Sequence, residues 1–183
     1  MRETTAKSQN SNLSLKVTTI KKSIIGIIAI TLLYACKKSD GICQFLPIGE
    51  QGWNKKDTML FEVPASTQEA DYDVLLLTRV TRQFAHRDLW VVVEQGFGNT
   101  DSIASNASQS IRRYADTIQI NIADKNGYFI GKGRDLLEYS TPIRFVRLKE
   151  GDGATFRIHH LQNTPNVTGV HDIGIEVSAL EKK

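Results

Sequence analysis

Residues 117–122 alternate polar and apolar side chains without interruption, in the order Thr-Ile-Gln-Ile-Asn-Ile. Successive side chains of a β-strand point to opposite faces, so this order places Ile118, Ile120 and Ile122 on one buried face. The Asp-Lys-Asn-Gly sequence at 124–127 predicts a tight turn, because Asn-Gly readily adopts the positive φ angles that hairpins need. Residues 128–131 are predicted to return as the next strand. Such a pattern favours antiparallel β-structure.

Strand-like segments of this kind recur over residues 57–178, separated by turn residues. The predicted strands are 58–63, 72–82, 89–94, 117–122, 128–131, 143–148, 155–160 and 170–177. The continuous apolar run at 89–94 is typical of a buried central strand. Residues 96–113 are rich in Gly, Asn and Ser and predict a long loop, with one helical turn near Ser110. With no long helical pattern, we predict an all-β fold: an antiparallel β-sandwich or jelly roll of about eight strands.

A different pattern precedes this region. Lys21 and Lys22 are followed by the apolar run 23–35, and Cys36 comes directly after Ala35. This is the layout of a secretory signal peptide, and a cysteine at the cleavage point is typical of a bacterial lipoprotein. A transmembrane helix is the alternative, but it needs ~20 apolar residues and this run is shorter. We therefore predict cleavage before Cys36 and acylation of its nucleophilic thiol.

The predicted organisation follows from that cleavage. Residues 1–35 are the signal peptide, 36–56 a lipidated N-terminus and tether, 57–178 the β-sandwich domain, and 179–183 a C-terminal tail. The signal peptide contains five of the 23 basic residues and one of the 20 acidic residues, which leaves 18 basic and 19 acidic residues. The basic character therefore belongs to the signal peptide, and nucleic-acid binding loses its electrostatic basis.

Cysteine usage excludes a disulfide framework. The chain has two cysteines, and acylation of Cys36 leaves Cys43 without an intrachain partner. Cys43 is either a small apolar residue or an exposed thiol, and we favour the first interpretation.

Three sequence blocks, taken together with the leader, resemble one known family. They are Trp53 with Phe61; Asp116-Thr117-Ile118 leading into 122–133; and 170–177, with Tyr72-Asp73-Val74, Arg79 and Leu89-Trp90-Val91 in between. The order and spacing of these blocks resemble the GldH family of gliding-motility lipoproteins from the Bacteroidota. The resemblance covers most of residues 36–178. His159-His160-Leu161-Gln162-Asn163 departs from it, because family members often carry a Met-Arg pair before the last strand.

The resemblance implies a β-rich envelope protein tied to gliding motility and its secretion machinery. It implies a non-enzymatic role, no cofactor and no catalytic residues. The partners it implies are the membrane, through the lipid anchor, and other envelope lipoproteins or secretion-machinery proteins. Lys37 and Lys38 follow the cysteine without the acidic run expected of a surface-export signal. We therefore expect an outer-membrane anchor with the domain facing the periplasm.

Metal binding has little support in the sequence. His159 and His160 are adjacent on one predicted strand, so their side chains point to opposite faces. His171 could approach one of them, but a structural zinc site needs further ligands, and His86 is far away in sequence. We expect surface or rim histidines and no metal site.

Two further patterns are superficially similar to catalytic or phosphate-binding sites. Asp71 and Asp73 share a strand face and could form an acid/base pair or a calcium corner, although solvated carboxylates are the simpler interpretation. Gly131-Lys132-Gly133-Arg134 lacks the strand-to-helix context of a phosphate loop and is predicted to be a bulge or turn. The G-x-S-x-G elbow of serine hydrolases does not occur. A lipoprotein hydrolase that uses an acidic pair is therefore the weakest of the hypotheses.

Aromatic residues support an alternative function. They are Trp53, Tyr72, Trp90, Tyr114, Tyr128 and Phe129. Some of them could form a sugar-stacking platform, while others must build the β-core. A carbohydrate- or peptidoglycan-binding lipoprotein module is therefore the second hypothesis.

Overall fold

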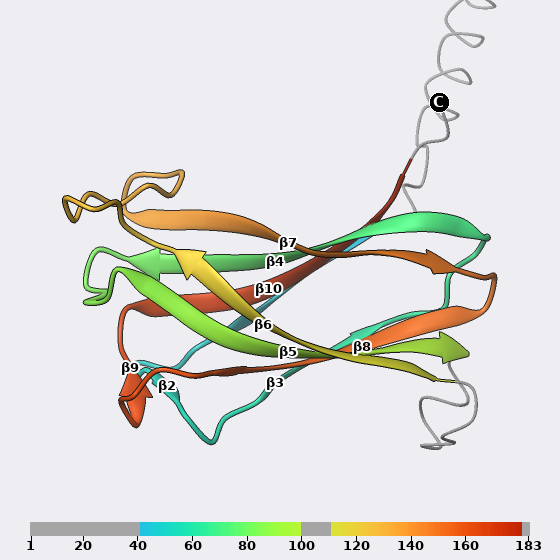
Figure 1. Ribbon diagram of the computed structural model, residues 1–183, viewed down its shortest axis with the longest axis horizontal. Coiled ribbons are helices and arrows are strands. Elements are labelled where there is room, and N and C mark those ends of the chain that lie inside the picture. The colour runs from blue at the N-terminus through green and yellow to red at the C-terminus, as the bar shows by residue number, and fades with distance from the viewer. Residues whose placement is uncertain (1–40, 100–110, 181–183) are drawn as a thin grey trace, which may run out of the picture. The chain divides into compact units, whose positions relative to one another are not determined.

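The computed structural model describes residues 41–99 and 111–180, and Figure 1 shows them as a two-layered β-structure. The predicted signal peptide, Cys36 and the predicted turn at Ser110 lie outside the described residues. The strands are β1 Gly41–Pro47, β2 Trp53–Asn54, β3 Met59–Val63, β4 Ala70–Thr81, β5 Asp88–Asn99, β6 Arg112–Asn121, β7 Leu136–Leu148, β8 Asp152–His160, β9 Asn166–Val167 and β10 Val170–Ala179.

The long strands form two four-stranded antiparallel sheets. One has the order β1-β10-β4-β7 and the other β3-β8-β5-β6, while β2 and β9 pair separately. The hydrogen-bonded pairs β1–β10, β3–β8, β4–β7 and β5–β6 are nested one inside the other along the chain. This nesting is the topology of a jelly roll, in which one long hairpin is wound into two sheets. The all-β sandwich prediction is therefore confirmed.

The core lies between the two sheets and is built from alternate residues of each strand. Val74, Leu76 and Val80 contribute from β4, and Val91 and Val93 from β5, all of them buried. Both Ile120 and Ile122 are buried as well, as the alternation at 117–122 predicts. This arrangement leaves the opposite face of each sheet available to other side chains.

The predicted tether at 36–56 is wrong over residues 41–47. These residues form β1, which pairs along its whole length with β10, from Gly41 opposite Ser178 to Pro47 opposite Asp172. The strand signal is weak because β1 is an edge strand with Gly at its start and Pro at its end, where neither residue weakens a sheet. The described domain therefore begins by residue 41, before the predicted start at 57.

Two predictions around β6 are also wrong. Residues 96–99 and 112–113 belong to β5 and β6, so the predicted loop at 96–113 is shorter. The partner of β6 is β5, and residues 128–131 form no strand, only a single bridge between Ala123 and Phe129. The turn itself is confirmed, because Gly127 has φ 85° and its N–H donates to the Asp124 carbonyl at 3.1 Å.

Candidate functional site

The histidines singled out in the sequence do not come together. His160 is fully buried, and its Nε2 lies 3.1 Å from the Trp53 carbonyl oxygen, to which it donates. His159 is half-buried on the opposite face of β8, as predicted, and His171 is on β10 of the other sheet. Among residues 41–99 and 111–180, no group of three His, Cys, Asp or Glu side chains could hold a metal ion.

Burial lowers the pKa of His160, the hydrogen bond to the Trp53 carbonyl opposes this effect, and the neighbouring Lys55 and His159 lower the pKa further. The neutral imidazole therefore suits its position against Trp53, whose ring it meets edge-on with centroids 5.4 Å apart. This histidine belongs to the core of the domain.

Asp71 and Asp73 lie on the same face of β4, as their spacing predicts. Exposed Asp71 lies 3.9 Å from Arg147, and this arginine donates to Glu69 at 2.9 Å. Half-buried Asp73 keeps one buried carboxylate oxygen without a hydrogen-bond partner. The two carboxylates therefore have different surroundings.

An ion pair links three strands on the outer face of the β1-β10-β4-β7 sheet. Arg79 donates to both carboxylate oxygens of Asp172, at 2.6 and 2.7 Å, and Asp172 is only 2% exposed. The guanidinium carbon lies 4.0 Å from the centre of the Phe45 ring, which covers the pair. The hydrogen bond to Asp172 raises the pKa of Arg79. His171 Nδ1, on the same strand, also lies 2.7 Å from Asp172. The carboxylate thus joins β10 to Arg79 of β4, and Phe45 of β1 packs over the guanidinium.

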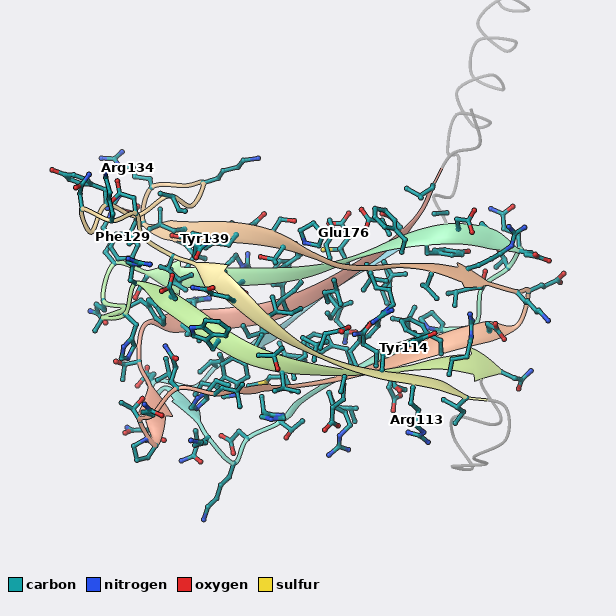
Figure 2. All side chains as sticks on the ribbon, viewed as in Figure 1. Arg113, Tyr114, Phe129, Arg134, Tyr139 and Glu176 are labelled. Atoms are coloured by element: carbon teal, nitrogen blue, oxygen red, sulfur yellow. The ribbon has the colours of Figure 1, made fainter. Side chains whose placement is uncertain are left out.

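A second ion pair joins the two sheets at the β6–β7 edge. Arg144 of β7 donates to Asp116 of β6 at 2.8 Å, and Gln95 donates to the same carboxylate oxygen at 2.6 Å. The Arg144 guanidinium lies 3.9 Å from the centre of the Tyr114 ring. This cluster closes the edge of the sandwich, and Figure 2 labels Tyr114 there.

A cleft opens beside this cluster, on the outer face of the second sheet. Its volume is about 350 Å³, and Arg113, Arg157 and Thr155 are among its lining residues. Gly96 forms part of the lining, and a Cβ at this position would come within 2.9 Å of the Thr155 hydroxyl. The absence of a side chain at Gly96 therefore keeps the cleft open to a small polar ligand.

The six aromatic residues do not form one platform. Trp53 and Tyr72 are buried in the core, and Phe129 packs against it. Trp90 is exposed on β5, but Tyr114 pairs with the inward-facing Gln95 and so lies on the other face of that sheet. Tyr128 is exposed after the end of β6. The register therefore separates the exposed aromatic rings.

The segment between β6 and β7 forms a fixed projecting loop, which we call the Tyr128 loop (residues 123–135). Asp124 shapes its tip, because its side chain accepts the backbone N–H groups of Asn126 at 2.8 Å and Tyr128 at 2.9 Å. Ile130 N–H donates to the Ile122 carbonyl at 3.1 Å. Tyr128 is nevertheless 72% exposed and Ile130 56% exposed.

Tyr139 of β7 fixes the base of this loop. Its hydroxyl donates to the Ile122 carbonyl at 2.7 Å, and its ring lies against Gly131, where a Cβ would come within 2.5 Å of the ring. Lys132 and Glu138 exchange two backbone hydrogen bonds of 2.9 and 2.7 Å. Figure 2 labels Tyr139 at the end of the sandwich where this loop lies. The Gly131–Arg134 segment is thus a bend with a single bridge at Lys132, where the sequence predicts a bulge or turn.

Sequence reasoning missed the Tyr128 loop because residues 128–131 have strand-like composition. The sequence signal that could have identified the loop is the pair Gly131 and Gly133, because glycine is frequent where the backbone leaves a regular strand. In the structure Gly133 has φ 122°, which a regular strand does not contain. A regular strand at 128–131 would place Tyr128 and Ile130 on the same face. It would not by itself predict that both side chains are exposed.

Cys43 is exposed on β1, so the second interpretation, an exposed thiol, holds in place of the favoured small apolar residue. Partial burial raises the pKa of its thiol, and the carboxylates of Glu176 and Glu138 raise it further. Within the described part of the chain, no helix is long and apolar enough to cross a membrane.

Comparisons with known proteins support one family. A family model described as GldH lipoprotein matches residues 43–177. Among curated protein sequences, none matches the chain.

Similar solved structures include a protein from Sulfurospirillum deleyianum, with 12% identity and a TM-score of 0.43 over 77% of this chain and 99% of that one. They also include the VP2 subviral particle of infectious bursal disease virus, with 13% identity and a TM-score of 0.32 over 79% of this chain and 34% of that one. These scores carry no argument about function.

Proposed function

Because this chain belongs to the GldH lipoprotein family, we propose that it is a lipid-anchored envelope protein and a non-enzymatic assembly component of the gliding and secretion machinery. The observation that carries the proposal is the family match, which spans the domain from β1 to β10. The Arg79–Asp172 pair is consistent with it, because both carboxylate oxygens serve the fold. The family is not known as an enzyme family.

The proposed anchor is Cys36, in the outer membrane with the domain in the periplasm. Cys36 precedes Gly41, the first residue of β1, by five positions. Single acyl chains bind membranes only marginally, whereas several hold a protein firmly. The acylated domain is therefore expected to remain in the membrane fraction.

Replacement of the acylated residue tests the anchor. We expect Cys36→Ser to lose membrane retention and to keep the folded domain, with Cys43→Ser as the matched cysteine control. Membrane fractionation followed by mass spectrometry of the N-terminal peptide measures both retention and acylation. Normal retention of the Cys36→Ser protein would contradict the anchor.

Native electrophoresis of detergent extracts tests the assembly role. The proposal predicts that the wild-type lipoprotein migrates in a complex larger than one chain in a detergent micelle. Migration as a single chain from cells that are actively gliding or secreting would contradict it.

The cleft over Gly96 favours one alternative, a glycan-binding module on the same anchor. The Arg113 side chain makes no hydrogen bond or ion pair to another described residue, and it lines the cleft together with Arg157 and Glu94, which pair with each other. Retention of the lipoprotein on insoluble peptidoglycan, lost in Arg113→Ala and kept in Arg147→Ala, would support this function. Equal retention of both variants, or none of the wild type, would exclude it.

A further inference from the structure

We infer that the Tyr128 loop is a docking element for a partner protein, and that this partner presents an apolar pocket bordered by carboxylates. The inference rests on the proposed function, since it names the surface through which an assembly component would bind. Tyr128 and Ile130 are the anchor residues, and Lys125, Lys132 and Arg134 form the surrounding rim.

The first argument is the exposure of apolar side chains from a fixed backbone. Tyr128 is 72% exposed and Ile130 56% exposed, although Asp124, Tyr139 and Gly131 hold the loop in one conformation. A mobile loop could fold such side chains back onto the domain, but this loop cannot do so while its base is fixed. A rigid element loses little entropy on binding, and exposed tyrosines are frequent energetic centres of interfaces.

The loop also carries exposed positive charge. Lys125, Lys132 and Arg134 are exposed and make no ion pair with any residue that the structure describes. The Arg82 guanidinium adds a fourth cation at the base of the loop, where it donates to the Arg134 carbonyl at 3.2 Å. Among the carboxylates of the loop and its base, Asp124 is engaged by the loop backbone, whereas Asp135 and Glu138 are exposed. Cations therefore outnumber free carboxylates around the two apolar residues, which favours an acidic partner surface.

The loop also lies far from Gly41, the first residue of β1. Gly41 lies in one cross-strand row with Asp73 and Phe145, whereas the loop ends at Leu136, opposite Thr81. Eight residues along β4 correspond to about 26 Å at the usual rise, and β1 and β7 are opposite edges of the sheet. The loop is thus at the opposite end and the opposite edge of this sheet from Gly41, and Figure 2 labels its residues Phe129 and Arg134 at that end. This placement favours a protein partner over the anchoring bilayer.

Site-specific photocrosslinking in the full lipoprotein, within its native envelope, tests the inference. A photoreactive phenylalanine analogue replaces Tyr128, and a matched probe replaces Phe145, which is 70% exposed in the Gly41 row. We expect the probe at 128 to form one product with a protein that mass spectrometry identifies, at a peptide rich in Asp or Glu. The probe at 145 is expected not to reach that protein.

Variants of the rim and of the anchor residues give the second measurement. The double change Lys132→Glu and Arg134→Glu is expected to lower the yield of the product about tenfold or more. The pair Tyr128→Ser and Ile130→Ser, introduced without a probe, is expected to lower co-purification of the same protein by a similar factor. Thermal unfolding of each variant shows whether the domain is still folded.

The outcomes separate this inference from the proposed function. Lipid adducts alone at position 128, no adduct, or a yield unchanged by charge reversal would overturn the docking role. If wild-type co-purification then persists, the assembly function stands and another surface binds the partner. If the wild-type lipoprotein co-purifies with no envelope protein, both the inference and the proposed function fail.

Discussion

The Arg79–Asp172 pair and the Tyr128 loop are both fixed by short hydrogen bonds, but the first buries a charged side chain and the second exposes apolar side chains. Around Asp172 a charged group is buried on the outer face of its sheet, and Phe45 covers it. In the loop, a charged group and a buried phenol shape the backbone so that Tyr128 and Ile130 point outward. The first arrangement stabilises the fold, because it joins neighbouring strands. The second leaves apolar area exposed, and this is the reason for which we propose a partner there.

The largest effect on stability is expected for Asp172→Ala. This change leaves the Arg79 guanidinium without the carboxylate that binds it at 2.6 and 2.7 Å, and we expect a loss of about 3 kcal/mol in the free energy of unfolding. Urea denaturation measures it. Glu69→Gln, which breaks the exposed pair with Arg147, is the control and is expected to change little. Equal effects of the two variants would show that the buried pair has no special role.

A smaller loss is expected for Gly133→Ala in the loop. Gly133 has φ 122°, and a Cβ there would collide with the Leu136 carbonyl oxygen, so we expect a cost of about 1–3 kcal/mol. Gly127→Ala is the matched control, because its φ of 85° is also positive but nothing lies within 4 Å of the added carbon. Thermal unfolding compares them. A Gly133→Ala protein as stable as the wild type would mean that the base of the loop is not fixed.

Tyr139→Phe removes one hydrogen bond at the base of the loop and keeps the ring against Gly131. We expect a loss of about 1 kcal/mol in the free energy of unfolding. Faster hydrogen exchange is expected only in residues 122–135. The exchange rates of β4 and β10 serve as the internal reference. Faster exchange throughout both sheets, or none in the loop, would contradict the separation of the two regions.

The smallest effect is a pH dependence from His160. Burial lowers the pKa of His160 below its usual value near 6.5, so the unfolded state binds a proton more readily than the folded state. The contribution of neutral His160 to the free energy of unfolding is therefore complete above about pH 6.5. It is lost as pH falls from there through the folded-state pKa. Urea midpoints between about pH 7.5 and 5 for wild type and His160→Gln measure it. Identical slopes would assign the dependence to other groups.

The sequence predicts the fold class for a physical reason, since the alternation at 117–122 admits only a strand with one buried face. It does not reveal β1, because an edge strand with a single neighbour requires no alternation, and its pairing with β10 joins residues far apart in the chain. Arg79 and Asp172 are 93 positions apart, so their contact appears only once the nested topology is known. The Tyr128 loop was hidden for the opposite reason: its composition suits a strand, and packing of Gly131 on Tyr139 overrides that preference.

Co-purification from the native envelope in mild detergent, with quantitative mass spectrometry, tests the central claim most directly. We predict stoichiometric recovery of gliding or secretion-machinery proteins with the wild-type lipoprotein. We also predict that Tyr128→Ser combined with Ile130→Ser loses them while Phe145→Ser keeps them. Recovery of the wild-type protein alone, or with glycan fragments only, would contradict an assembly role and would favour the cleft over Gly96 as the functional site.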